Sequence, residues 1–175
     1  MRRLLVLIAA LACLVLLSAG IYFVSGQHRV AAPLRATATS CHSTRELPDA
    51  KCTPGVADPR VTQDNIQTTI CVSGYTATVR PPSAYTDSLK AQQIKEYGYA
   101  DTNVADYEED HLIPLELGGH PTDPKNLWPE PRGGAEPASA KDRVENALSK
   151  RVCAGTMALA SAQSAIASDW PTAES

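Results

Sequence analysis

Apolar side chains return every three or four residues in four segments of the chain, and this spacing predicts an amphipathic helix in each. A short helix follows Thr62, and a longer one runs from Ser83, a typical N-cap residue, to Gly98, a typical stop. The third begins at Pro137, and the fourth follows it closely. The residues that share a face are, in chain order, Ile66 and Ile70; Tyr85, Leu89 and Tyr97; Val144, Leu148 and Val152; and Leu159, Ala162, Ile166 and Trp170.

Two other segments carry patterns that are typical of β structure. Residues 74–79, GYTATV, alternate in polarity and predict a short strand that ends at Arg80. The apolar run 112–115 and the segment that begins at Asn126 predict the two strands of a hairpin, with Gly118-Gly119 at its turn. The resulting order of helix, strand, helix, hairpin, helix and helix predicts a small α+β domain.

The N-terminal segment differs from the rest of the chain, because residues 4–24 contain no charged side chain. At 1.5 Å per residue, a helix of this length spans about 31 Å, the thickness of the hydrocarbon core of a bilayer. We therefore expect a transmembrane signal anchor at residues 1–26, a linker at residues 27–40 and an exported domain at residues 41–172. This protein would cross the cell membrane once, whereas cleavage of the segment, which stays open, would give a secreted protein.

Four cysteines fall in the expected exported domain, at Cys41, Cys52, Cys71 and Cys153. An even number of cysteines in an oxidising compartment is typical of disulfides, and no pair has the C-x-x-C spacing of a structural zinc site. Three pairings are possible. Of these, we expect a local bridge between Cys41 and Cys52 and a long-range bridge between Cys71 and Cys153.

The charge balance limits the class of partner. The first 30 residues hold three of the 16 basic residues and no acidic one, so the rest of the chain has 13 basic against 19 acidic side chains and a net charge of −6. Such a domain is poorly suited to coating nucleic acid through bulk electrostatics. A polyanionic substrate would have to be held locally, by a few cationic side chains and a metal ion.

One stretch of the sequence carries a specific resemblance. The run D-H-L-I-P-L-E-L-G-G begins at Asp110, and N-L-W-P-E-P follows it from Asn126. In this order, with a helix about ten residues later, the stretch resembles the HNH endonucleases, the ββα-metal nucleases. It is most similar to small exported bacterial proteins in which a segment like residues 69–83 precedes the run. The resemblance implies a ββα-metal core at about residues 105–153.

The resemblance also implies metal-dependent hydrolysis of phosphodiester bonds. His111 would act as the general base that activates water, because an imidazole with a pKa of about 6.5 is substantially neutral at pH 7. Asp110 would bind a divalent cation, with Mg²⁺ preferred and Mn²⁺ or Zn²⁺ as alternatives. Asn126 would accept a hydrogen bond from one imidazole nitrogen and so select the tautomer.

The sequence departs from the family at the last metal ligand, because no histidine follows His120. Two carboxylates of the third predicted helix, Asp142 and Glu145, share a face and are the candidate ligands. That face has an ordinary alternative explanation as the solvated side of an amphipathic helix. Lys141 and Arg143 are the candidates for binding a substrate phosphate.

Two functions therefore remain in view. The first is an exported, membrane-tethered HNH-like nuclease that acts on nucleic acid, with DNA and RNA both open. The second is a catalytically inactive exported module that keeps the HNH scaffold for binding. The chain has no H-E-x-x-H motif, which argues against a metalloprotease. The sequence leaves the oligomeric state open.

Overall fold

The computed structural model describes residues 41–44, 47–135 and 137–175. Its longer elements in these ranges are α2 (Tyr75–Val79), α3 (Ser83–Glu96), β1 (Tyr107–His111), β2 (Leu127–Pro131), α4 (Ala138–Cys153) and α5 (Leu159–Asp169). Short 3-10 helices lie at η1 (Gln63–Thr68), η2 (Val104–Asp106), η3 (Leu115–Leu117), η4 (Pro124–Asn126) and η5 (Trp170–Thr172).

The predicted signal anchor at residues 1–26 and the predicted linker at residues 27–40 lie outside the described residues. Within the part of the chain that the structure describes, no helix is both long enough and apolar enough to cross a membrane. The membrane anchor therefore stays a prediction from the sequence.

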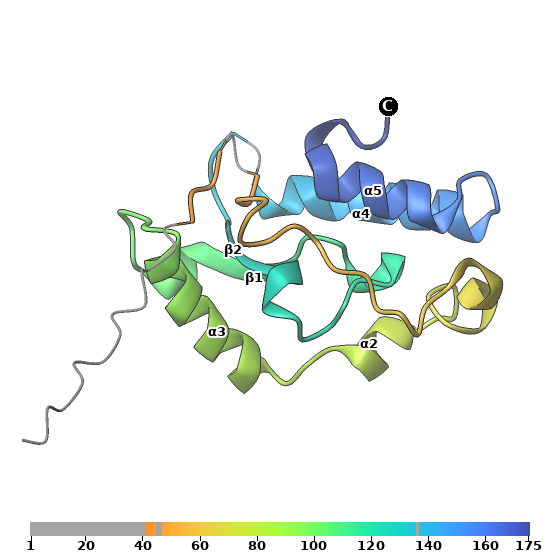
Figure 1. The fold of residues 1–175 in the computed structure, drawn as a ribbon, viewed down its shortest axis with the longest axis horizontal. Coiled ribbons are helices and arrows are strands. Elements are labelled where there is room, and N and C mark those ends of the chain that lie inside the picture. Colours follow the sequence, from red (N-terminus) through yellow and green to blue (C-terminus); the bar gives the residue numbers. More distant parts are fainter. Residues whose placement is uncertain (1–40, 45–46, 136) are drawn as a thin grey trace, which may run out of the picture. The chain divides into compact units, whose positions relative to one another are not determined.

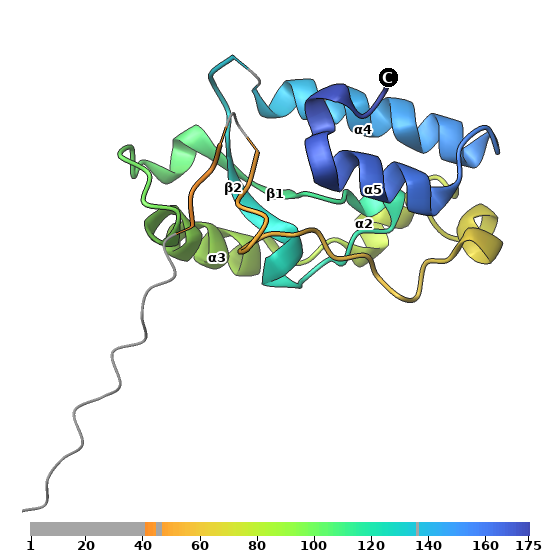
Figure 2. The ribbon, with the colours of Figure 1, turned by 45° about the horizontal axis from the view of Figure 1, so that its top comes forward.

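The two strands form an antiparallel hairpin in which Tyr107 pairs with Pro131 and His111 pairs with Leu127. Helix α3 packs against the hairpin, and α4 packs against α5 on its other side (Figure 1). In the turned view of Figure 2, α4 and α5 again lie side by side. The described chain is therefore a small α+β domain, as the sequence predicted.

The main hydrophobic core lies between α4, α5, η1 and η3. It buries the apolar faces that the sequence predicted for three of the four helices, at Ile66, Ile70, Val144, Leu148, Val152, Leu159, Ala162, Ile166 and Trp170. A second cluster around Tyr97, Leu112 and Trp128 lies beside the hairpin. Helix α3 follows its predicted face only at its C-terminal end: Tyr97 and the neighbouring Ile94 are buried, whereas Tyr85 is exposed. Gln93, which was not predicted to be buried, is buried as well.

Both predicted disulfides are present. Cys41 is bonded to Cys52, 11 residues away, and Cys71 is bonded to Cys153, 82 residues away. The second bridge ties the segment after η1 to the last residue of α4. It therefore joins two parts of the main core that are distant in sequence.

The strand predicted at residues 74–79 is wrong, because this segment forms helix α2. Gly74 precedes the helix with a φ of 84°, and Tyr75 packs against the main core. A strand of this length needs a neighbouring strand to satisfy its backbone, whereas a helical turn satisfies its hydrogen bonds within itself. The alternation in polarity was too short to decide between the two.

The first strand of the hairpin is also placed differently from the prediction. Asp110 and His111 lie on the first strand, as predicted, but β1 ends at His111, and the apolar run 112–115 is buried in the connection between the strands. Gly118 has the positive φ expected of it, 71°, but it ends η3 and does not form a two-residue hairpin turn. The strands are joined by residues 112–126, a loop whose apolar side chains enter the cores on both sides.

Candidate functional site: the cavity beside His111

His111 is the last residue of β1, and only 5% of its surface is exposed. Its Nε2 atom lies 3.0 Å from the carbonyl oxygen of Pro121. Because a carbonyl only accepts hydrogen bonds, Nε2 carries the proton and Nδ1 keeps its lone pair. Burial lowers the pKa of His111 below its ordinary value, which favours the neutral form at pH 7. The imidazole therefore has the protonation and tautomer that a general base requires.

A small polar cavity of about 60 Å³ lies beside this imidazole. It is lined by side chains from elements that are far apart in the chain, among them Arg80 after α2, Asp110 and His111 of β1, Glu116 of η3, and Asp142 and Glu145 of α4. The two residues of the Asp-His pair and both predicted helix carboxylates thus share one cavity. A cavity of this size admits water and the edge of a substrate, but it does not enclose a large ligand.

Asn126 has a different role from the one predicted, because its hydrogen bonds go to the backbone and none joins it to His111. Oδ1 accepts from the amide of Val56 at 3.1 Å and from that of Ile113 at 3.0 Å. Nδ2 donates to the carbonyl of Ile113 at 2.9 Å and to that of His120 at 3.1 Å. These four bonds use the full capacity of the side-chain amide. Asn126 therefore holds the connecting loop in shape.

Gly119 makes the position of Asn126 possible. A Cβ atom at Gly119 would lie 1.7 Å from the carbonyl oxygen of Ile113 and 2.9 Å from Nδ2 of Asn126. Any side chain at this position would push the loop apart. The loop in turn carries Pro121, whose carbonyl orients the imidazole of His111. Gly119, the second glycine of the pair, thus allows the close packing that holds Pro121 beside His111.

Neither residue predicted to bind phosphate lines the cavity. Lys141 is 1% exposed, and its Nζ atom lies 2.6 Å from Oδ2 of Asp110. It also donates to Oε1 of Glu145 and, at 2.9 Å, to the carbonyl oxygen of His111. Arg143 is exposed and donates to the carbonyl of Ser139 at 2.9 Å. Lys141 is therefore buried in contact with the residues around His111 and is not available to a substrate phosphate.

Arg80 is a cavity residue that the sequence analysis did not single out. Its side chain is exposed and lines the same cavity as His111. In the sequence, Arg80 stands out only as the end of the predicted strand 74–79, and no local pattern connects it with the Asp-His pair. The fold brings Arg80 to the cavity because α2 ends beside η3. It is an accessible cation at a cavity that is otherwise acidic.

Burial changes the protonation of the carboxyl groups around the site. It raises the pKa of Glu109 to about 8, and the charge of Asp110 adds to the effect. Burial also raises the pKa of Glu145, while the Lys141 ammonium beside it acts in the opposite direction and favours the carboxylate. It raises the pKa of Glu130 to about 9, so this carboxyl is protonated at neutral pH. The pKa of Glu116 is raised as well, mainly by burial. The acidic surroundings of His111 therefore carry less negative charge than their composition indicates.

The predicted metal ligands do not form a ready cation site. In the described ranges, no group of three or more His, Cys, Asp or Glu side chains is arranged to hold a metal ion. Asp110 and Glu145 are close to each other, but the ammonium of Lys141 lies between them. A divalent cation therefore does not fit between these two carboxylates in this arrangement. Asp142 is exposed at the rim of the cavity.

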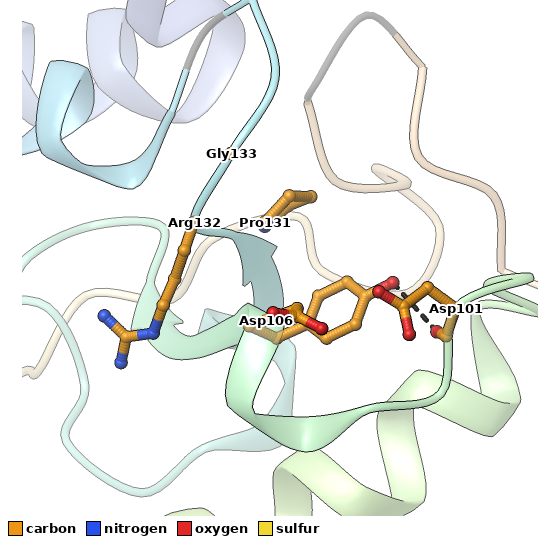
Figure 3. Close-up of a pocket in the computed structure, with 6 residues that line it drawn as sticks. Asp101, Asp106, Pro131, Arg132 and Gly133 are labelled. Carbon is orange, nitrogen blue, oxygen red and sulfur yellow. Dashed lines mark hydrogen bonds between the residues drawn. The ribbon is translucent and has the colours of Figure 1, made fainter.

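A larger hollow of about 330 Å³ lies at the far end of the hairpin (Figure 3). The hydroxyl of Tyr107 donates there to the carbonyl of Asp101 at 2.9 Å. Asp106 also lines the hollow, while Arg132 turns away from both aspartates and pairs with Glu108 at 2.9 Å. The arginine that lines the hollow is thus paired with Glu108 and not aligned with either aspartate, so these groups are not arranged around a common substrate position.

No protein-family model, no curated protein and no solved structure matches this chain. The geometry and chemistry of the His111 cavity are therefore the basis on which a function can be proposed.

Proposed function

We propose that this domain hydrolyses phosphodiester bonds of nucleic acid at the cavity beside His111, as an HNH-like nuclease. The observation that carries the proposal is the hydrogen bond from Nε2 of His111 to the carbonyl of Pro121. It leaves Nδ1 as the base, on a buried ring whose lowered pKa keeps it neutral at pH 7. Such a base removes a proton from water as the water attacks phosphorus. The P–O bond to the leaving oxygen breaks, and that oxygen takes up a proton from solvent.

Arg80 is the group that we propose binds the substrate phosphate. A phosphodiester that approaches this cavity meets Asp110, Glu116 and Asp142, and these carboxylates repel it unless a cation is close. The Arg80 guanidinium can form two parallel hydrogen bonds to phosphate oxygens. Because Arg80 is exposed, it can meet the substrate before the substrate reaches His111.

A divalent cation, preferably Mg²⁺, is the cofactor that the resemblance to HNH nucleases implies. Such an ion would stabilise charge on the phosphoryl oxygens. The Lys141 ammonium excludes it from the space between Asp110 and Glu145, so no step of the reaction is assigned to a metal.

One observation favours a second function, an inactive exported module that uses the same scaffold for binding. Lys141 forms ion pairs with Asp110 and Glu145 inside the protein, where an active metal centre would leave these carboxylates free for the ion. For both candidates, the two disulfides support a location outside the cytoplasm, because such bonds persist in oxidising compartments.

The test is cleavage of plasmid DNA and of single-stranded RNA by the full chain, purified with both disulfides formed. The assay is run with Mg²⁺, Mn²⁺, Zn²⁺ or EDTA. We expect cleavage, with a loss of about 10²–10⁴-fold in rate for His111→Ala, because that variant lacks the base. Arg80→Ala is expected to lower cleavage as well. Arg143→Ala is the matched control, since this arginine is exposed on α4 and does not line the cavity.

Two outcomes would decide against the nuclease. Absence of cleavage by folded wild-type protein under every condition would favour the binding module. Cleavage that survives unchanged in a folded His111→Ala variant would mean that the activity does not arise at this cavity.

A further inference from the structure

The ammonium of Lys141 has the surroundings of a bound metal ion. Three oxygen atoms contact it: Oδ2 of Asp110 at 2.6 Å, the carbonyl oxygen of His111 at 2.9 Å, and Oε1 of Glu145. Two of these oxygens come from β1 and one comes from α4. Carboxylate and carbonyl oxygens are the ligands that hard divalent cations take in proteins.

The cation at this point is charged and is shut off from water. Lys141 is 1% exposed, and burial alone would lower its pKa. The charges of Asp110 and Glu145 outweigh burial and raise the pKa of Lys141 above its ordinary value. The Lys141 side chain joins the end of β1 to α4 through its contacts with Asp110 and the His111 carbonyl on one side and with Glu145 on the other.

A further carboxyl group of the cluster lacks a partner. Glu130 of β2 is 2% exposed, and its Oε1 atom is buried without a hydrogen bond. Glu130 lies on the same face of the hairpin as Asp110, because it is two residues along β2 from Trp128, the residue paired with Asp110. A buried polar atom without a hydrogen bond is uncommon in a folded protein and indicates room for a further ligand contact. The cluster therefore offers more oxygen ligands than one ammonium uses.

We propose that Lys141 is the resident cation of this centre: its ammonium takes the place of a divalent ion between Asp110 and Glu145, so that a divalent ion binds there only when Lys141 is removed. The lysine makes the link between β1 and α4 independent of metal. This assignment does not depend on whether the domain cleaves nucleic acid, because it concerns ion binding and stability.

Replacing the lysine should convert the cluster into a metal site. Lys141→Ala removes the ammonium and leaves Asp110, Glu145 and Glu130 around the vacated volume. In EDTA we expect this variant to melt below the wild type, because buried carboxylates lose their counterion. With Ca²⁺, Mg²⁺ or Mn²⁺ at saturating concentration, its melting temperature should rise by at least about 5 °C, with one ion bound per chain. The wild type should show neither effect.

The experiment uses the full chain with both disulfides formed. Melting is followed by circular dichroism, and binding is measured by titration calorimetry with CaCl₂, MgCl₂ or MnCl₂. Lys141→Met fills the volume without a charge and should bind no ion. Asp110→Asn combined with Lys141→Ala should lose the ion-dependent rise. Lys150→Ala, an exposed lysine on the same helix, should behave as the wild type in every condition.

Three results would overturn the proposal. The first is a divalent ion bound by the wild type and lost in Asp110→Asn, because the ion and the ammonium would then coexist. The second is a folded Lys141→Ala variant that binds no ion. The third is a Lys141→Ala variant that stays unfolded with every ion, since an ion that can replace the ammonium would restore the fold.

Discussion

Asn126 and Ile113 are joined by a reciprocal pair of hydrogen bonds: Nδ2 donates to the Ile113 carbonyl at 2.9 Å, and Oδ1 accepts from the Ile113 amide at 3.0 Å. The side-chain amide supplies the partners that a neighbouring strand would otherwise give to Ile113. Strand β1 can therefore end at His111 without leaving the next buried backbone groups unpaired. This places the imidazole at the end of the sheet, where the cavity begins.

Asn126→Ala should destabilise the domain by about 3 kcal/mol or more, because the buried amide and carbonyl of Ile113 lose their partners. Urea unfolding of the two proteins measures the difference in free energy. Asn146→Ala is the control, since this asparagine is exposed and donates to one carbonyl, that of Asp142. Equal effects of the two substitutions would show that Asn126 does not hold the loop.

Gly119→Ala should destabilise the domain by about 3 kcal/mol or more, because its Cβ atom would overlap backbone that cannot move independently. The overlap is with the carbonyl oxygen of Ile113, at 1.7 Å. Gly133→Ala is a matched control, because a Cβ atom there meets nothing within 4 Å. Urea unfolding of both variants separates steric overlap from the general effect of replacing glycine. Similar midpoints for the two would contradict the close approach at Gly119.

The imidazole of His111 should titrate below pH 6.5, because burial disfavours its charged form. Since the unfolded chain takes up this proton first, the contribution of His111 to stability is complete above pH 6.5. It is lost as the pH falls toward the lower pKa of the folded state. The pH dependence of the ring-proton chemical shift in NMR measures this pKa. A value at or above that of a free histidine would argue against a neutral base at pH 7.

The wild type should lose stability as the pH rises, and the Glu109→Gln variant should lose less. Burial raises the pKa of Glu109 to about 8, and both carboxylate oxygens are buried without hydrogen bonds. The folded protein therefore holds this proton more tightly than the unfolded chain, and the stability that the proton confers falls between about pH 4.5 and pH 8. Melting temperatures across this range should decline less in Glu109→Gln than in the wild type. Parallel curves would assign the decline to other groups.

The two disulfides should differ in their effect on stability. On the loop-entropy argument, the bridge between Cys71 and Cys153 contributes about 4.5 kcal/mol and that between Cys41 and Cys52 about 3 kcal/mol. The difference follows from their sequence separations of 82 and 11 residues. Unfolding of the two double Cys→Ser variants in urea tests this order. The reverse order would mean that strain or packing outweighs loop length.

The features that the sequence predicted well depend on short-range pattern. The helices around Leu148 and Ile166 were found because their apolar residues repeat at helical spacing, and that spacing decides which face is buried. The two disulfides were predicted because the four cysteines at positions 41, 52, 71 and 153 allow only three pairings. The Asp-His pair was found because it belongs to a continuous run of residues.

The strands were harder to predict, because a strand is completed by a partner that its own sequence does not contain. Residues 74–79 alternate in polarity, yet they find no neighbouring strand and form α2. The apolar run 112–115 enters the core from a loop, since the side chain of Asn126 satisfies the backbone at Ile113. Local pattern alone does not distinguish these outcomes.

The sequence by itself determined the residue types of the site: a histidine beside an aspartate, a glycine pair, an asparagine and a helix with two carboxylates. Only the tertiary structure decided what each does. It places Arg80 at the cavity and buries the Lys141 ammonium between Asp110 and Glu145. It also directs the side-chain hydrogen bonds of Asn126 to backbone groups. The physical reason is that burial and hydrogen-bond partners set the charge and the direction of a side chain. Both depend on contacts between segments that are distant in the chain.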